Sequence, residues 1–441
     1  MSCADKRERS IAHRLSAAAL AVAQLSALMG LIGFSQGVRA DPVQLSPNVT
    51  ATAIGCATSN NGTGHVVCLE YSTGGGLVGV SWQPPPALNG GPGTEPPGTL
   101  HTLAPAFPNP AAPPVGAPGC GFTNDNTGIV SCLVVTKDSN GFYLSGYAFY
   151  PPPNPKTQVT NVQAHAQLGN GPIAAATATV SNPTCTGSIG NLVICALAVN
   201  QQLWGIAFDP RKPTATALTN LSLGPVVGAP NCASVPHTTI ASVCAVRQQG
   251  GLLGFSFQYD ANTAGIDMVS SVSLSTPALT SDPSCAAFTA PGPAAGQLTT
   301  SASCAITAGN NLVGVNFNPQ TGAKNGPVSL GTAPDSGAWS ASPGCSDAVD
   351  RQLGHLTSCA VVSSNANVFN VTFDLHVRNS IAGPYAANTN GSPSCVALAI
   401  DANQLYCGAL TSGSSASGLE LPEKRGPLNP AVMKSVQDIL N

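Results

Sequence analysis

The 15 cysteines of this 441-residue sequence are the residues whose type and spacing most clearly indicate chemistry. Apart from Cys3, they form seven consecutive pairs whose members are 10 to 19 residues apart. Zinc sites use closely spaced thiolates such as Cys-x-x-Cys, so these wider spacings predict no metal site. An even count predicts disulfides instead, and although the sequence leaves their connectivity open, a hairpin would favour pairing within each pair. The pairs are Cys56 and Cys68, Cys120 and Cys132, Cys185 and Cys195, Cys232 and Cys244, Cys285 and Cys304, Cys345 and Cys359, and Cys395 and Cys407.

Aromatic side chains could stack on a flat ligand such as a sugar ring, and the sequence has few of them. Trp204 is the second residue of a strand-like segment, and Trp339 precedes Pro343 in a predicted loop or first strand. Both are candidate ligand contacts, with core packing as the alternative. Trp82 occupies a position that is Phe in five equivalent segments, so we interpret Trp82 as a core residue.

Three histidines recur between the two cysteines of their pairs, namely His65, His237 and His355. No two histidines share a metal-ligand spacing. They are predicted to lie on hairpin turns, either as ordinary exposed residues or as a set of ligand contacts on one face of the molecule.

Motifs for catalysis are not found. The predicted mature sequence, residues 41–441, has no Gly-x-Ser-x-Gly elbow, no phosphate-binding loop and no Ser-x-Asp-x-Gly-x-x-Trp box. Asp347 and Asp350 are close in sequence, but acids in turns are usually solvated turn formers. We therefore predict a protein without enzymatic activity and without a cofactor.

The first 40 residues resemble an export signal. A basic segment around Arg7 and Arg9 precedes an apolar stretch over residues 15–34, and Val38-Arg39-Ala40 forms a small-x-small cleavage site. The stretch is long enough to leave an uncleaved anchor as the alternative. After cleavage no membrane span remains, and we expect a secreted, periplasmic or extracellular protein.

The predicted mature chain is acidic, with 11 Lys and Arg against 17 Asp and Glu. Nucleic-acid binding requires clustered Lys and Arg, so no nucleic-acid partner is expected.

A repeat surrounds each cysteine pair. After the second cysteine comes a strand-like hexad whose third residue is Gly in six repeats and Asn370 in the other. A strand glycine usually marks a close backbone approach, which fits packing of one sheet on the next. The hexads are residues 77–82, 144–149, 203–208, 252–257, 312–317, 368–373 and 416–421. A strand with a Leu-Gly-like signature follows at residues 168–169, 223–224, 274–275 (Leu-Ser) and 330–331, and six repeats begin with Pro-x-Cys.

Seven units of four strands, spaced by about 57 residues, predict an all-β fold, a seven-bladed β-propeller over residues 41–421 with one disulfide in each blade. The last unit lacks a fourth strand, whereas Val43-Gln44-Leu45-Ser46 is an unpaired one. The N-terminal strand is therefore predicted to close the last blade. Residues 84–118 are predicted to be a Pro-rich insertion, and residues 422–441 a tail with a short helix beginning at Asn429.

The order Pro-x-Cys, cysteine strand, Leu-Trp-Gly-Ile-Ala-Phe (residues 203–208) and Leu-x-Leu-Gly (residues 221–224) resembles the blade of bacterial fucose-binding seven-bladed propeller lectins. The resemblance implies the scaffold over most of residues 41–421, with Trp204 as the one matching sugar-contact position. The histidine of that family's motif is replaced here by the repeated glycine or by Asn370.

These observations predict an exported binding protein whose partner is a carbohydrate or a cell-surface protein. The alternatives are a structural or adhesion protein that binds a protein partner without sugar recognition, and a propeller hydrolase with an unrecognised site.

Overall fold

The structure is a computed structural model in which the chain divides into two units, Met1–Ala40 and Asp41–Asn441. All described residues belong to the second unit, so the predicted signal peptide and the predicted tail helix lie outside them. The described residues are 43–44, 51–58, 65–72, 76–82, 100–103, 112–123, 129–149, 162–169, 171–187, 192–209, 217–234, 242–291, 294, 297–350, 354–374, 379–398, 401–411 and 416–422.

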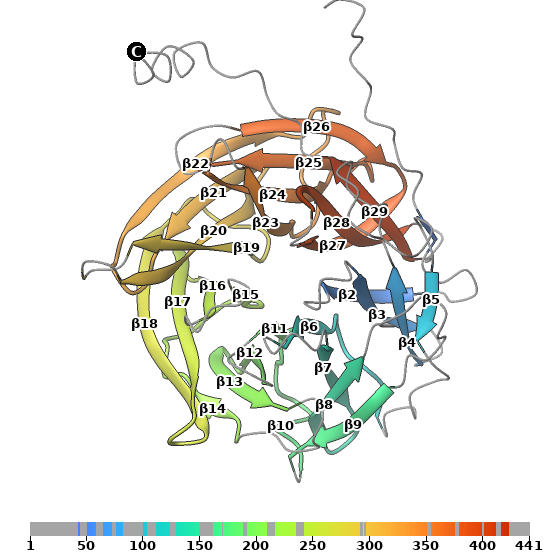
Figure 1. Cartoon of the computed structure of the whole chain (residues 1–441), viewed down its shortest axis with the longest axis vertical. Coiled ribbons are helices and arrows are strands. Elements are labelled where there is room, and N and C mark those ends of the chain that lie inside the picture. Colours follow the sequence, from blue (N-terminus) through green and yellow to red (C-terminus); the bar gives the residue numbers. More distant parts are fainter. Residues whose placement is uncertain are drawn as a thin grey trace, which may run out of the picture. The chain divides into compact units, whose positions relative to one another are not determined.

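The described strands form seven antiparallel sheets, which we number in chain order (Figure 1). Sheet 1 contains β2 (Ala51–Thr58), β3 (Val66–Ser72), β4 (Leu77–Trp82) and β5 (Leu100–Leu103); sheet 2 contains β6 (Gly119–Phe122), β7 (Val130–Lys137), β8 (Gly141–Phe149), β9 (Val162–Leu168) and β10 (Ala174–Ala175); sheet 3 contains β11 (Thr184–Gly187), β12 (Val193–Val199), β13 (Gln202–Phe208) and β14 (Thr219–Asn220). Sheet 4 contains β15 (Asn231–Ala233), β16 (Ser242–Gln248), β17 (Gly251–Asp260) and β18 (Gly265–Ser275); sheet 5 contains β19 (Ser284–Pro291), β20 (Leu298–Ala308), β21 (Asn311–Phe317) and β22 (Lys324–Thr332). Sheet 6 contains β23 (Gly344–Asp350), β24 (Gly354–Val362), β25 (Val368–Phe373) and β26 (Asn379–Ala386); sheet 7 contains β27 (Thr389–Leu398), β28 (Asp401–Thr411), β29 (Ala416–Pro422) and β1 (Val43–Gln44).

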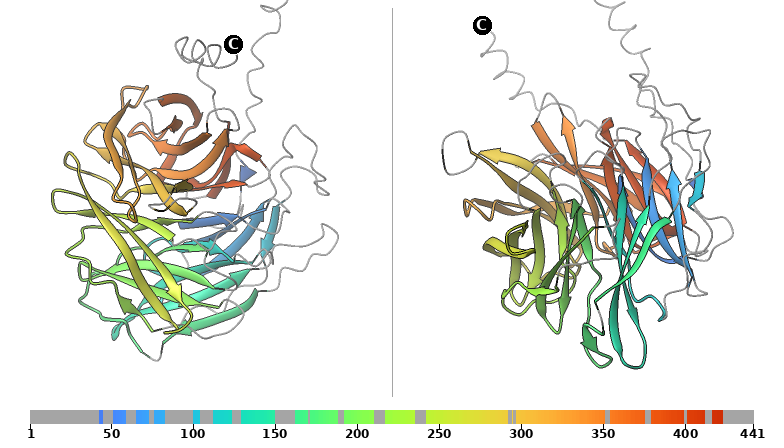
Figure 2. Two further views of the ribbon diagram at one scale, coloured as in Figure 1. Left: turned by 60° about the vertical axis from the view of Figure 1, so that its left-hand side comes forward. Right: turned by 60° about the horizontal axis from the view of Figure 1, so that its bottom comes forward.

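The first strand of each sheet is the innermost one, and these inner strands form a ring. Each contacts the inner strand of the next sheet, and β27 of sheet 7 contacts β2 of sheet 1. Figure 1 looks down the centre of this ring, and Figure 2 shows the sheets from two further directions. The predicted all-β propeller is therefore confirmed.

The N-terminal strand joins the last sheet. β1 pairs antiparallel with β29, with Val43 opposite Gly418 and Gln44 opposite Ser417. Sheet 7 thus combines the two ends of the folded unit, as the unpaired strand at residues 43–46 predicts.

The outer strands differ most from the prediction. β5 lies inside the segment 84–118 that the sequence predicts to be an insertion, and it pairs with β4. In sheet 3 the outer strand β14 ends at Asn220, before the Leu-Gly signature. In sheet 6 the outer strand β26 forms without that signature.

The hydrophobic core lies between neighbouring sheets. The hexad glycines of sheets 2, 4 and 5 leave room for an aromatic ring from the next sheet: a Cβ atom added to Gly254 would overlap the Phe317 ring, and one added to Gly146 would lie 3.2 Å from Phe208. The expected close packing of one sheet on the next is thus confirmed at these positions. Among the described residues, no helix has the length and apolar character needed to cross a bilayer.

Candidate functional site

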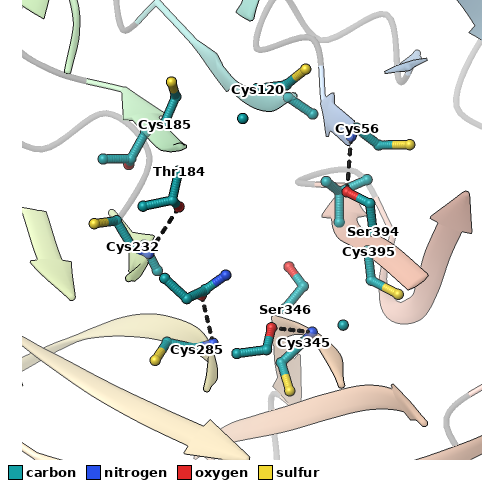
Figure 3. Close-up of a pocket in the computed structure, with 18 of the residues that line it drawn as sticks. Cys56, Cys120, Thr184, Cys185, Cys232, Cys285, Cys345, Ser346, Ser394 and Cys395 are labelled. Atoms are coloured by element: carbon teal, nitrogen blue, oxygen red, sulfur yellow. Dashed lines mark hydrogen bonds between the residues drawn. The ribbon is translucent and has the colours of Figure 1, made fainter. Parts of the chain in front are cut away.

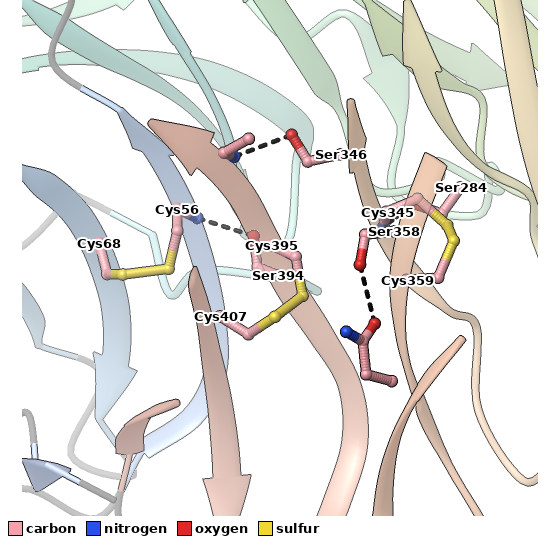
Figure 4. The surroundings of a disulfide bond; sticks show 12 residues. Cys56, Cys68, Ser284, Cys345, Ser346, Ser358, Cys359, Ser394, Cys395 and Cys407 are labelled. Carbon is pink, nitrogen blue, oxygen red and sulfur yellow. Dashed lines mark hydrogen bonds between the residues drawn. A yellow bond between two sulfur atoms is a disulfide. The ribbon is translucent and has the colours of Figure 1, made fainter. Parts of the chain in front are cut away.

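Seven disulfides surround the centre of the ring, and each joins the inner strand of one sheet to the second strand, as predicted. In all seven the two cysteines lie directly opposite each other. Their Cα atoms are 4.0 to 4.1 Å apart, the short spacing of a pair that does not exchange backbone hydrogen bonds. The backbone N–H and C=O of each inner cysteine therefore point away from the second strand, toward the ring. Figure 4 shows the disulfides of sheets 6, 7 and 1.

Four of these inner N–H groups donate to a side chain of the preceding sheet. The acceptor is the residue immediately before that sheet's own inner cysteine (Figure 3). The four bonds run from Cys56 N to Ser394 Oγ (2.8 Å), Cys232 N to Thr184 Oγ1 (3.1 Å), Cys285 N to Asn231 Oδ1 (2.8 Å) and Cys345 N to Ser284 Oγ (2.8 Å). Hydrogen bonds at this position therefore link sheets 3 to 4, 4 to 5, 5 to 6 and 7 to 1.

Glycine occupies this position in the remaining three sheets, as Gly55, Gly119 and Gly344. A Cβ atom at any of them would overlap the carbonyl oxygen of the proline in the next sheet. Direct backbone contact thus replaces the side-chain hydrogen bond where the inner strands come closest.

The position of the proline in the Pro-x-Cys repeat can be explained by the hydrogen bonding of this inner edge. It lies two residues before the cysteine, so its backbone faces the same way as the cysteine backbone. Proline has no N–H, so no donor is left without a partner on the inner edge.

Two further sets of hydrogen bonds join neighbouring sheets, one at residues before the inner cysteines and one at residues after them. On one side of the cysteines, Asn182 Oδ1 accepts from Ala117 N (3.0 Å) and Ser342 Oγ accepts from Asp282 N (3.1 Å). On the other side, Ser346 Oγ accepts from Ala397 N (2.8 Å).

These inner strands surround a cavity of about 620 Å³, a size typical of small-molecule sites. The cysteine sulfurs point away from its centre (Figure 3), so small side chains and backbone edges form the wall. Asp282 is the one carboxylate among the described lining residues, and Arg247 pairs with it at 3.1 Å. In the described part of the chain no three His, Cys, Asp or Glu residues gather as a metal site. The wall offers hydrogen bonds to a ligand but no pair of acids for general acid and base catalysis.

Trp204 lies at the interface between sheets 2 and 3. Its side chain is half-buried and packs against a cluster that includes Phe142 of sheet 2 and Leu197 of sheet 3. The indole Nε1 is enclosed and has no hydrogen-bond partner in the described structure. Asn220 lies directly opposite Trp204, and Gln202 lies two residues before it, so both amides belong to the same face of sheet 3.

Trp339 is a core residue. Its side chain is 5% exposed, its Nε1 donates to the Gly331 carbonyl (3.0 Å), and its ring meets Phe369 edge-on at 5.8 Å. The candidate surface contact at Trp339 is therefore not retained, and core packing, the alternative, describes it.

The three histidines do not form a set of exposed contacts. His65 is 3% exposed, and its Nδ1 lies 3.0 Å from Ser81 Oγ, so its predicted place on an exposed turn is wrong. His355 lies on strand β24 opposite Val349, and His237 lies outside the described residues.

The residues between proline and cysteine were not among the candidates from the sequence. The recurring Pro-x-Cys motif was the available signal, because its middle residue is either Gly or a hydrogen-bonding residue in all six repeats that have it.

No protein-family model matches the chain, and no curated protein matches it in sequence. Among solved structures, the BP39L lectin from Burkholderia pseudomallei is similar, with 14% identity and a TM-score of 0.51 over 86% of this chain and 99% of the lectin. The likeness shows a shared fold. The fucose-specific lectin from Aleuria aurantia is less similar, with 10% identity and a TM-score of 0.43 over 78% of this chain and 97% of that one. A GH93 α-L-arabinofuranosidase from Fusarium graminearum has 10% identity and a TM-score of 0.47 over 86% and 97% of the two chains. The propeller scaffold implied by the repeat is supported at the level of the fold by the BP39L lectin.

Proposed function

We propose that this protein is an exported seven-bladed propeller, with each sheet as one blade, and that it binds carbohydrate at the interface between sheets 2 and 3 around Trp204, which we call the Trp204 site. The observation that carries the proposal is the half-buried Trp204 with Asn220 and Gln202 on the same face of sheet 3. An indole supplies a flat apolar surface for the C–H groups of a sugar ring, and amides donate to and accept from hydroxyl groups.

The residues equivalent to Trp204 in three other sheets are buried, which supports a single site of this kind among the four sheets compared. The second hexad residue is Leu253 in sheet 4, Val313 in sheet 5 and Phe369 in sheet 6, and these side chains are 4%, 4% and 1% exposed. Only a partly exposed aromatic ring can accept a ligand without displacing core residues, and of these four positions Trp204 alone meets that requirement.

Export fits the seven disulfides, since disulfides form and persist in oxidising compartments outside the cytosol. We place the mature protein in the periplasm or outside the cell.

A glycan array with oxidised residues 41–441 tests the proposal. We expect selective binding that falls at least about tenfold in Trp204→Ala, because the stacking surface is lost, and that falls less in Trp204→Phe. Val227→Ala, a change at an exposed position before β15, is the control for the preparation of the variant proteins.

Folded protein that leaves the array blank would reject carbohydrate binding and favour an adhesion protein with a protein partner. Selective binding that survives Trp204→Ala would show that carbohydrate binds elsewhere than at the Trp204 site.

A further inference from the structure

The inner edge of the ring has more hydrogen-bond acceptors than free donors. Six inner strands carry a proline two residues before the cysteine, which adds a carbonyl and no N–H. Four of the seven inner cysteine N–H groups are already bound by Ser394, Thr184, Asn231 and Ser284. The cavity wall therefore favours a ligand that brings its own donors.

The hydroxyl groups of this wall can still donate. Ser284, Thr184 and Ser394 each use an oxygen lone pair to accept a cysteine N–H, and each keeps the proton of its own O–H group. Acceptors from the backbone and donors from these side chains thus lie on the same wall. A ligand with many hydroxyl groups matches both.

The described lining of the cavity carries no unpaired charge that would attract an ion. The one ionised side chain among the described lining residues is the negative Asp282. Arg247 is held outside the lining by Asp282 Oδ1 and by the Leu279 carbonyl (3.4 Å). An anion would meet a carboxylate and carbonyl oxygens, whereas an uncharged ligand has no charge to desolvate.

We propose that the central cavity binds an uncharged polyhydroxylated small molecule, of alditol to disaccharide size, at a position separate from the Trp204 site. The volume of about 620 Å³ accommodates such a molecule. Its hydroxyl groups donate to the inner-edge carbonyls and accept from the serine and threonine hydroxyls.

The test uses ligand-observed NMR with oxidised residues 41–441 and two probes, sorbitol and trehalose. We expect saturable binding of at least one probe with a Kd of about 1–10 mM. Ala229→Phe and Ala397→Phe each place a ring in the cavity from a half-buried lining position, and each is expected to weaken binding at least about tenfold.

Val227→Phe is the matched control, because Val227 is 47% exposed, lies two residues from Ala229 and does not line the cavity. Near-ultraviolet circular dichroism tests whether each variant is folded. If Ala229→Phe or Ala397→Phe does not fold, the other one is used, or Ala233→Phe at a third lining position.

No saturable binding of either probe, or equal loss in Val227→Phe, overturns the proposal. Probe binding that only Trp204→Ala removes also overturns it, because the probe then occupies the Trp204 site. A blank glycan array together with probe binding that Ala229→Phe abolishes rejects carbohydrate binding at the Trp204 site and leaves the proposal for the cavity intact.

Discussion

The residue before each inner cysteine determines how two neighbouring sheets meet at the ring. The cross-strand disulfide turns the cysteine N–H toward the neighbouring sheet, where it needs an acceptor in a buried environment. Ser284 supplies that acceptor between sheets 5 and 6, and Thr184 supplies it between sheets 3 and 4. Where the residue is Gly119, the inner strands are too close for any side chain. One position thus sets both the polar satisfaction and the spacing of the ring.

Ser284→Ala tests this role directly. The substitution leaves the Cys345 N–H without its acceptor, and a buried unpaired donor costs about 1–3 kcal/mol of unfolding free energy. Urea unfolding under oxidising conditions measures the change. Ser284→Thr keeps an oxygen at the same position, as Thr184 does in sheet 3, so we expect it to lose much less unfolding free energy. Equal losses in the two variants would show that the hydrogen bond to Cys345 N does not account for the destabilisation.

At the scale of the elements, the hexad glycines allow the sheets to pack. The third strand of one sheet has a glycine where the ring that ends the next sheet's hexad lies, as with Gly254 and Phe317 or Gly314 and Phe373. A side chain at the glycine would push the ring, and with it the neighbouring sheet, outward. The same contact between a hexad glycine and the phenylalanine of the next hexad occurs at Gly146 and Phe208, so it is a packing device that recurs at three sheet interfaces.

Gly254→Ala is expected to destabilise the protein by about 1–3 kcal/mol, because its methyl group overlaps the Phe317 ring in a filled core. Gly171→Ala is the matched control, since a Cβ there meets nothing within 4 Å. Thermal unfolding of the two variants and the parent protein provides the comparison. A Gly254→Ala protein as stable as Gly171→Ala would mean that the sheets can move apart freely.

The sequence predicted the features that repeat and missed those that depend on neighbouring sheets. The disulfides and hexad strands recur in register, so periodicity alone locates them. β26 carries no Leu-Gly signature and is held by its pairing with β25, which no local pattern records. The burial of His65 beside Ser81, and of Trp339 against Phe369, arises from contacts between separate strands. Trp204 was a candidate because it is one of three tryptophans and matches the sugar-contact position of the lectin blade, but its exposure depends on packing against sheet 2.

At the scale of the whole molecule, the ring is closed by strands from both ends of the folded unit. Sheet 7 takes β27, β28 and β29 from the end of the chain and β1 from its beginning. The contact of β27 with β2 then joins the last sheet to the first, and the Cys56 N–H donates to Ser394 across the same junction. Without β1, the outer edge of β29 would present unpaired backbone groups, and such an edge favours association with other chains.

A designed crosslink tests this closure in solution. Gln44 and Ser417 are opposite each other in the pairing of β1 with β29, so cysteines at these positions lie within reach of a disulfide. We expect Gln44→Cys with Ser417→Cys to form an eighth bridge, detected by peptide mapping without reduction, while the seven native bridges remain. The crosslink is expected to raise the thermal unfolding temperature, because it fixes a terminal strand that would otherwise separate first. The single variant Gln44→Cys controls for reactivity of the new thiol. Free thiols at both positions in a folded double variant would show that the ring closes without β1, and the unpaired edge of β29 would then have to be covered in another way.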